Sequence, residues 1–204
     1  WSAIAQKATR RVLDVARVRS GDLPNLRFEL ADRSYHHQRF SLDDCPEHFI
    51  HATLAAEDKR YWSHGGIDLL ATLRAAKDYF VKGRVVSGAS TITQQLIKVA
   101  QPRSRTISAK LTECLQARKL ERQWNKRKIL EEYLNRLDYG NACRGSSTAC
   151  WFYFDKPLAD LSLAESALLA GLPNAPSRLN PIRHPKKARQ RQHLILDRMH
   201  RNGW

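Results

Sequence analysis

The sequence predicts a mainly α-helical fold with one principal domain, and three observations support this prediction. Beyond residue 46, apolar side chains recur every three to four positions in most segments, as they do along the buried side of a helix. Several of these segments begin at a helix-capping residue and end near a glycine or a proline. Weak strand-like alternation is confined to residues 26–42. With 204 residues and 42% hydrophobic content, the chain can bury one core and carry a small appendage.

The chain is strongly basic. Its 35 Lys and Arg residues outnumber its 20 Asp and Glu residues, and the formal net charge is +15. Such an excess favours a polyanionic partner: nucleic acid, anionic lipid or a phosphorylated substrate. The sequence has no run of 18 apolar residues and no signal-peptide pattern, so it predicts no segment that spans a bilayer. Because the chain begins with Trp1 rather than Met, we expect a fragment or a processed product that followed a membrane anchor.

The four cysteines are Cys45, Cys114, Cys143 and Cys150. None of them has Cys-x-x-Cys spacing, so the sequence does not predict a zinc site. Cys114 falls inside a helical pattern and is predicted to lie in the core. Cys143 and Cys150 share one irregular stretch and could pair in an oxidising compartment, although we expect free thiols.

The N-terminal segment differs from the rest of the chain. The pattern of residues 1–24 predicts a basic helix that ends in a turn at its Gly and Pro residues. Residues 26–42 predict one or two short strands. We therefore separate residues 1–45, a helix and a strand-like segment, from the helical region over residues 46–204.

The first helix of that region runs into the stretch AAEDKRYWSHGG at residues 55–66. Pro46 is suited to a first helical position, and the two glycines at 65 and 66 predict the end of the helix. A Glu-Asp pair lies near this end, close to a histidine. Two adjacent carboxylates can be plain surface charge, or they can be acid–base groups for sugar chemistry. The rest of the sequence has to separate these alternatives.

Residues 67–86 contain more large apolar side chains than one helical stripe needs. Cations are mixed among them, namely Lys77, Lys82 and Arg84. One interpretation is a core helix followed by a strand-like connection. The other is a partly exposed apolar surface that enters a lipid interface.

Residues 90–100, STITQQLIKVA, predict a helix with Ser90 as its N-cap. Its apolar stripe comprises Ile92, Leu96 and Val99. A second, polar stripe comprises Thr91, Gln95 and Lys98. A polar row can simply face solvent. Here, however, it follows a flexible Ser-Gly-Ala loop, and a helix N-terminus beside hydroxyl groups favours anion binding.

Another helix is predicted over residues 108–123. Its predicted buried stripe comprises Leu111, Cys114, Leu115 and Leu120. Glu113 lies off this stripe and one turn after Lys110, so the structural interpretation of Glu113 is an ion pair with that lysine.

Two later helices are predicted from their capping residues. Asn125 is suited to cap a helix that contains Glu131 and Glu132, which we interpret as structural. Ser162 and Glu165 match the S-x-x-E capping box. Because capping already explains Glu165, we assign it no catalytic role.

The last predicted helix is basic. It begins near Pro185 and ends near Gly203. Its inward side chains are predicted to be Leu194, Ile195 and Met199.

Five motifs carry a resemblance to a known family. In order, they are EDKRYWSHGG, GASTITQQLIK, KLTECLQARKLE, KRKILEEYLN and LSLAESALLAGLPNAPSRLNP. Together they resemble the peptidoglycan glycosyltransferases, glycosyltransferase family 51, over about residues 46–200. This domain occurs on the N-terminal side of class A penicillin-binding proteins and also as a monofunctional enzyme. The stretches RTISAKLTE and LAGLPNAPS are most similar to the 1C-type class A proteins.

The resemblance implies a lysozyme-like large helical lobe and a smaller apolar jaw lobe at the membrane, here about residues 67–88. It also implies the polymerisation of lipid II into glycan strands. The 4-hydroxyl of the incoming lipid II would attack the anomeric carbon of the growing chain, invert its configuration and release undecaprenyl pyrophosphate. The implied location is the periplasmic face of the bacterial cytoplasmic membrane, with membrane anchoring in the full-length protein.

The resemblance also implies partners. These are lipid II, the nascent glycan chain and the anionic membrane surface, with a covalently linked transpeptidase domain left open for the full protein. Nucleic acid is not expected. No cofactor is certain, and a divalent cation, Mg²⁺ or Mn²⁺, at the pyrophosphate is left open.

Roles carry over onto matching positions. Glu57 matches the catalytic glutamate, the general base that takes the 4-hydroxyl proton. Glu113 matches the second glutamate, which assists on the pyrophosphate side. Lys98 and Lys110 would neutralise the leaving pyrophosphate. The other predicted substrate contacts are Asp58, Tyr61, His64, Ser90, Thr91, Gln95 and Arg105.

The sequence departs from the family pattern at a few positions. Tyr61 stands where the family usually has Phe, and Val99 stands where many members have Asn. Asp155 replaces the usual Gly of the YFGK segment. Ala109 stands where many members have Arg, so one phosphate contact is missing, for which Arg103 or Arg105 could compensate. These departures bear on activity rather than on fold.

Two other functions remain as alternatives. A lytic transglycosylase or lysozyme-type hydrolase also uses an essential Glu in a lysozyme-like fold. The STITQQLIK stripe and Lys110 disfavour it, because glycan cleavage requires no binding site for pyrophosphate. A basic nucleic-acid-binding module is the other alternative. Its cations would form a recognisable binding motif, whereas here they are spread over many helices.

Overall fold

The structure is a computed structural model that describes residues 39–82, 90–102 and 106–204. This part of the chain contains α-helices and short 3-10 turns, and it has no β-strand. The predicted mainly α-helical fold is therefore confirmed. The predicted N-terminal helix and most of the predicted strand segment lie outside the described residues.

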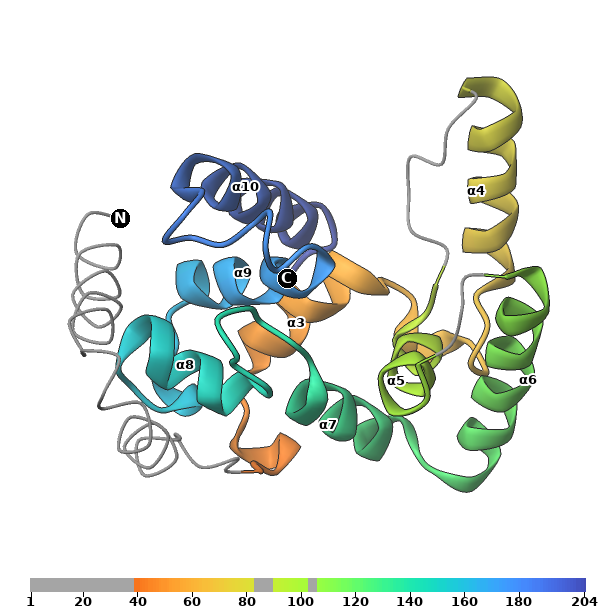
Figure 1. Ribbon diagram of the computed structural model, residues 1–204, viewed down its shortest axis with the longest axis horizontal. Helices are drawn as coiled ribbons and strands as arrows, with labels where there is room; N and C mark the ends of the chain where they lie inside the picture. The colour runs from red at the N-terminus through yellow and green to blue at the C-terminus, as the bar shows by residue number, and fades with distance from the viewer. Residues whose placement is uncertain (1–38, 83–89, 103–105) are drawn as a thin grey trace, which may run out of the picture.

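The helices form two groups. They are α3 (Glu47–Glu57), α4 (Leu69–Lys82), α5 (Ile92–Ala100), α6 (Ile107–Gln123), α7 (Lys126–Arg136), α8 (Ser146–Phe154), α9 (Leu163–Gly171) and α10 (Pro185–Arg201). Figure 1 shows α3 and α7–α10 in one group and α4–α6 in the other. Helix α5 packs against both α6 and α7, so it links the two groups.

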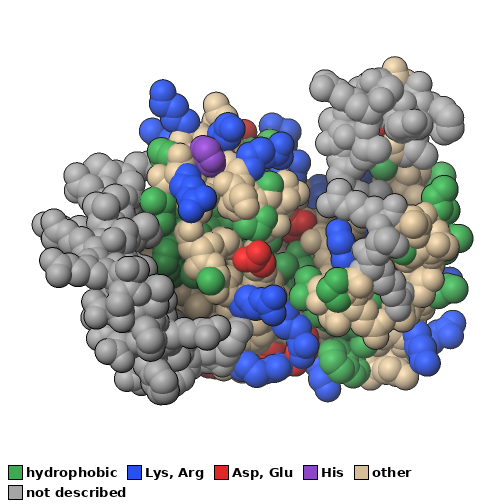
Figure 2. Space-filling model, viewed as in Figure 1, with side chains coloured by type: hydrophobic (Ala, Val, Ile, Leu, Met, Phe, Trp, Pro, Cys, Tyr) green, Lys and Arg blue, Asp and Glu red, His purple; other side chains and the backbone are tan. Residues whose placement is uncertain are grey.

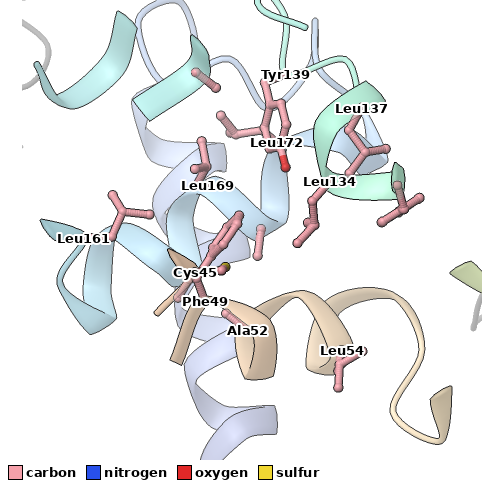
Figure 3. Close-up of a cluster of buried hydrophobic side chains, with 14 of the residues drawn as sticks. Cys45, Phe49, Ala52, Leu54, Leu134, Leu137, Tyr139, Leu161, Leu169 and Leu172 are labelled. Atoms are coloured by element: carbon pink, nitrogen blue, oxygen red, sulfur yellow. The ribbon is translucent and has the colours of Figure 1, made fainter. Parts of the chain in front are cut away.

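The core lies in the first group. Helix α3 packs against α9 and α10, and α9 packs against α10. Phe49, Ala52 and Leu54 of α3 are fully buried, and Figure 3 shows Phe49 near Leu169 of α9. Removing these apolar surfaces from water stabilises the packing and fixes the direction of α3, whose last residue is Glu57.

Two of the predicted helix caps, Asn125 and Ser162, are confirmed. The Asn125 side chain accepts a hydrogen bond from the Lys128 backbone N–H at the start of α7. Ser162 and Glu165 form the capping box of α9, and Glu165 also pairs with Lys156 at 2.6 Å. These contacts agree with a structural role for Glu165.

The two glutamates of α7 also make structural contacts. Glu131 accepts a hydrogen bond from the Leu42 backbone N–H at 2.8 Å, and Glu132 pairs with Arg39 and Arg136. Both therefore tie the segment before α3 to α7, or brace α7 itself.

Helix α3 ends earlier than predicted. It ends at Glu57, whereas the sequence predicted an end near Gly65 and Gly66. Asp58 leaves the helical conformation with φ −156° and ψ 77°, and residues 61–63 form a separate 3-10 turn. Tertiary hydrogen bonds to the Asp58 carboxylate compete with continuation of the helix. Their partners lie elsewhere in the chain, so the residues around Asp58 do not predict them.

Several predicted apolar stripes are wrong in part. Leu111 and Leu115 of α6 are 62% and 71% exposed, and α6 instead buries Ala117. Val99 and Leu194 are also exposed, and Cys114 is only half-buried. In α6 the buried side differs from the one that the apolar spacing favours. In α5 and α10 the rest of the predicted stripe is buried, namely Ile92, Leu96, Ile195 and Met199.

Helix α4 has an exposed apolar face. Its exposed large side chains are Leu69, Leu70, Leu73 and Val81. For these side chains the core-helix interpretation is wrong, and the interpretation of an exposed apolar surface holds. The predicted strand-like connection lies in residues 83–89, outside the described residues.

Asp68 fixes the start of α4. Its Oδ1 accepts a hydrogen bond from the Ala71 backbone N–H at 2.7 Å, and its Oδ2 accepts one from Arg60 Nε at 3.0 Å. Burial alone raises the pKa of Asp68, but the hydrogen bonds and charge of Arg60 outweigh burial and hold the pKa below its ordinary value. The sequence reasoning missed this residue.

All four cysteines are free thiols, and Cys45, Cys143 and Cys150 are buried. Burial raises the pKa of Cys45 and of Cys143 to about 12. In the described part of the chain, no helix is both long enough and apolar enough to cross a membrane.

Candidate active site

A cleft of about 1090 Å³ contains most of the predicted site residues that the structure describes. The end of α3, α5, α6 and α10 all contribute to its walls. Its basic lining residues are Lys59, Arg60, Arg74, Lys98, Lys110, Arg191, Arg198 and Arg201. Its acidic lining residues are Glu57, Asp58, Asp68, Glu113 and Asp138. Figure 2 shows acidic side chains, in red, among basic ones, in blue, between the two parts of the molecule.

Glu57 is held at the end of α3 by a hydrogen bond from α5. Gln95 Nε2 donates to Glu57 Oε2 at 2.9 Å, and Tyr133 Oη donates to Gln95 Oε1 at 3.1 Å. Burial raises the pKa of Tyr133, and the charge of Glu57 raises it further, so the phenol stays protonated and can donate. Glu57 and Gln95, which were each predicted as site residues, are therefore in direct contact.

The two oxygens of Glu57 differ. Oε1 is buried and has no hydrogen-bond partner, and the nearest cation is Arg191 Nη2 of α10 at 3.7 Å. Oε2 accepts one hydrogen bond, and a carboxylate oxygen can accept a second one. Oε2 is thus the oxygen that can meet a ligand in the cleft without rearrangement.

Asp58 is held by hydrogen bonds within the protein, whereas Glu57 keeps an acceptor position for a ligand. Its carboxylate accepts hydrogen bonds from the Ile92 backbone N–H and from His64 Nε2, each at 3.0 Å. The other ring nitrogen, His64 Nδ1, lies 3.5 Å from Lys126 Nζ. With the ring assigned as the Nε2–H tautomer, both of these contacts are satisfied. Asp58 is only 7% exposed, and it ties the end of α3 to the start of α5.

Tyr61 and His64 do not line the cleft. Tyr61 is fully buried, and its hydroxyl donates to the Lys126 carbonyl at 2.7 Å. His64 lies against Asp58 behind the cleft wall. The structure therefore places both residues as supports of the wall, and their predicted contacts with substrate gain no support from it.

Lys110 gathers three polar groups from two segments. Its Nζ lies 2.9 Å from Ser90 Oγ, 3.2 Å from Gln94 Oε1 and 3.1 Å from Glu113 Oε2. The predicted ion pair with Glu113 is confirmed, and Ser90 joins it as a cleft residue. Lys98 lines the same cleft from α5 and is exposed.

Thr91, rather than Ser90, is the N-cap of α5. Thr91 and Gln94 form a capping box, and Thr91 Oγ1 donates to the Gly66 carbonyl at 2.7 Å. Gly66 has a φ of +87°, and a Cβ there would lie 2.9 Å from the backbone of Ala117. Only glycine fits at this crossing with α6, so the Gly66–Thr91 contact fixes where α5 enters the cleft.

The sequence reasoning missed the contribution of α10. Arg198 Nη1 donates to the carbonyls of Ala55 and Ala56, at 3.2 and 3.3 Å, at the end of α3. Arg191 lies beside Glu57. Burial lowers the pKa of Arg191, and the charge of Glu57 opposes this effect. Arg191 and Arg198 are seven residues apart, so they lie on one side of α10. This spacing is the feature of the sequence that could have indicated a shared role for the two arginines.

Arg105 lies outside the described residues. Among the described residues, no group of three His, Cys, Asp or Glu side chains could hold a metal ion. A divalent cation at this site therefore stays a prediction.

Comparisons with known proteins found a matching family model and several relatives. A family model described as transglycosylase matches residues 26–200. Penicillin-binding protein 1A of Aquifex aeolicus is 47% identical over 165 residues, which is 80% of this chain and 23% of that protein. The Pseudomonas aeruginosa protein of the same name is 43% identical over 79% of this chain, and the Neisseria gonorrhoeae one is 46% identical over 78%.

The chain spans about a fifth of the length of the curated relatives it matches. These relatives carry the name 1A, so the similarity to the 1C type stays a prediction.

Proposed function

The chain belongs to the transglycosylase family, and on this basis we propose that its cleft polymerises lipid II into the glycan strands of peptidoglycan. The observation that carries the proposal is the placement of both matched glutamates in one cleft. Glu57 lies at one helix end with a free acceptor position, and Glu113 lies beside Lys110.

Glu57 acts as the general base. The 4-hydroxyl of the incoming lipid II donates its proton to Glu57 Oε2 while the hydroxyl oxygen attacks the anomeric carbon of the growing chain. The bond from that carbon to the pyrophosphate breaks, and its electron pair leaves with the pyrophosphate. Gln95 holds the carboxylate in place, since it donates to the same oxygen.

The cationic side of the cleft serves the leaving group. Negative charge on the pyrophosphate grows in the transition state, and fixed cations there lower the barrier more than they aid substrate binding. Lys110 and Lys98 supply this charge. Glu113 and Ser90 hold the Lys110 ammonium in position.

We also propose a membrane location and a longer functional protein. Exposed leucines on α4 dock on the outer face of the cytoplasmic membrane, and the net charge of +15 attracts anionic headgroups. The relatives named penicillin-binding protein 1A are about five times as long as the matched segment, which leaves room for a transpeptidase domain in the full protein.

The test is polymerisation by the purified chain. Labelled lipid II in detergent or in anionic vesicles is incubated with the wild-type protein and with Glu57→Gln, and the products are separated by size. We expect a ladder of glycan strands from the wild type alone, and digestion by a β-1,4-specific lysozyme should remove it. If the chain leaves lipid II intact and shortens preformed strands, the hydrolase alternative is right and the proposal is wrong.

A further inference from the structure

Arg191 has an unusual position relative to Glu57. Its side chain is only 15% exposed, and its Nη2 lies 3.7 Å from Glu57 Oε1, beyond hydrogen-bond range. Both Arg191 Nε and Glu57 Oε1 are buried without a hydrogen-bond partner. Most buried polar groups are paired, so two orphaned atoms on one ion pair need an explanation.

Gly171 sets the reach of Arg191. A Cβ on Gly171, the last residue of α9, would lie 2.9 Å from Arg191 Cγ and 3.1 Å from Ile195 Cδ1. The stem of Arg191 therefore runs through space that exists because residue 171 has no side chain. A neighbouring residue, Gln192, clamps α10 to α9 through a 2.6 Å hydrogen bond to the Ala164 carbonyl. The position of the guanidinium is thus determined by packing between α9 and α10.

We propose that Arg191 is a positioning residue that holds the Glu57 carboxylate from its buried side, so that Oε2 is the oxygen that accepts the substrate proton. This inference rests on the proposed function and adds a residue to it. The five sequence motifs that carry the resemblance to the family contain no part of α10.

The looseness of the pair suits a general base. A cation nearby attracts the negative charge of the carboxylate and so favours one orientation of the side chain. A tight, doubly hydrogen-bonded ion pair would occupy the oxygens and make the carboxylate a weaker base. At 3.7 Å, Arg191 supplies charge while it leaves the hydrogen-bonding capacity of Glu57 for Gln95 and the substrate.

Other charged and titratable groups also surround Glu57. They are Asp58, Lys98, Tyr133, Asp138, Tyr139, Arg191 and Arg198. Asp58 is occupied by His64 and the Ile92 backbone, and the raised pKa values of the two tyrosines keep them neutral. Arg198 shares the inner side of α10. Like Arg191 Nη2, which lies 3.5 Å from the Ala56 carbonyl, it donates to that carbonyl, but it makes no ion pair with Glu57. Arg198 is therefore the matched control for Arg191.

The experiment measures the ionisation of Glu57 directly. In the purified chain without substrate, the side-chain carboxyl ¹³C resonance of Glu57, assigned by its loss in Glu57→Gln, is titrated with pH. We expect the midpoint of Arg191→Gln to lie above that of the wild type, because the variant lacks the nearby cation. Arg191→Lys should shift it less, and Gly171→Ala should shift it in the same direction because it displaces the arginine stem. Arg198→Gln should leave the midpoint close to the wild-type value.

The same variants are then assayed with lipid II across pH. In Arg191→Gln, the acidic limb of the plot of kcat/KM against pH should move to higher pH, together with the NMR midpoint. An unchanged midpoint in the folded Arg191 and Gly171 variants would overturn the inference, and so would an equal shift in Arg198→Gln. If the wild-type chain polymerises nothing but the midpoint still moves, the proposed function fails while the contact between Arg191 and Glu57 stands.

Discussion

The exchange Lys110→Met tests the cationic side of the cleft. Methionine keeps the unbranched stem of lysine and removes the ammonium. The change deletes the contacts at 2.9, 3.2 and 3.1 Å to Ser90, Gln94 and Glu113. It therefore removes charge from the proposed pyrophosphate site without opening a large cavity.

Its effects on stability and on rate should differ widely. The side chains of the Lys110–Glu113 pair are 44% and 13% exposed, so solvent screens the pair and its loss should cost about 1 kcal/mol of unfolding free energy or less. Removing one preorganised group that stabilises transition-state charge typically lowers turnover about 10²–10³-fold. A large loss of rate in a protein of nearly unchanged stability is the expected signature.

Lys98 extends the test. The two lysines lie on α5 and α6, which pack together, and both line the cleft. If they serve one pyrophosphate, Lys98→Met and Lys110→Met should each reduce turnover more than lipid II affinity, and the double variant should be less than additive.

The assay compares initial polymerisation rates, lipid II affinity and thermal unfolding for the four variants. Lys119→Met is the control, because it removes the same charge from an exposed position on α6 outside the cleft. Fully additive effects confined to affinity would mean that the lysines only attract lipid II. An equal loss of turnover in Lys119→Met would mean that the net charge of the protein, and not the position of the lysines in the cleft, determines the rate.

Four further predictions follow from other contacts. Glu57→Gln should lower polymerisation about 10²-fold or more at unchanged thermal stability, and near wild-type turnover would contradict its role as base. Glu165→Gln should leave the rate nearly intact, whereas Glu165→Ala should lower the free energy of unfolding by about 0.5–2 kcal/mol, as chemical denaturation can measure. Because the hydrogen bonds and charge of Arg60 hold the pKa of Asp68 below its ordinary value, this carboxylate stabilises the fold above the pKa of the unfolded chain, about pH 4. The stabilisation is lost as pH falls through the folded pKa, so Asp68→Asn should flatten the acid limb of a stability–pH curve. Exchange of the exposed leucines Leu69, Leu70 and Leu73 of α4 for serine should weaken partition of the protein into anionic liposomes. Leu163→Ser, at an exposed position of α9, is the control. Unchanged partition of the α4 variant would count against membrane docking.

The sequence predicted the features that depend on local chemistry. The caps at Asn125 and Ser162 are found as expected, because a cap needs only a side chain and a backbone N–H a few residues away. The same holds for the Lys110–Glu113 pair, one turn apart on α6. The contact between Glu57 and Gln95 spans 38 residues, and the sequence did not predict it. The resemblance to a family implied only that both residues belong to the site.

Features set by packing could not be predicted. The apolar spacing of α6 marks Leu111 and Leu115 as buried, but burial depends on which side a neighbouring helix covers. Arg191 reaches Glu57 across more than 130 residues of chain, through space left by Gly171. A basic helix gives no local indication that one of its arginines turns inward toward a carboxylate.

The uneven distribution of charge in the cleft has a consequence for inhibitor design. The lining of the cleft includes the Glu57 carboxylate, which repels anions, and the Lys110 ammonium, which attracts them and comes from a different helix. A compound with a phosphonate at each end would gain at the lysine and lose at the glutamate. A scaffold with a single anionic group at one end and a neutral hydroxyl or amide donor at the other would match both. A compound with these two groups exchanged should lose most of its affinity. An inhibitor of this kind would therefore be selective for this cleft over protein surfaces that are merely basic.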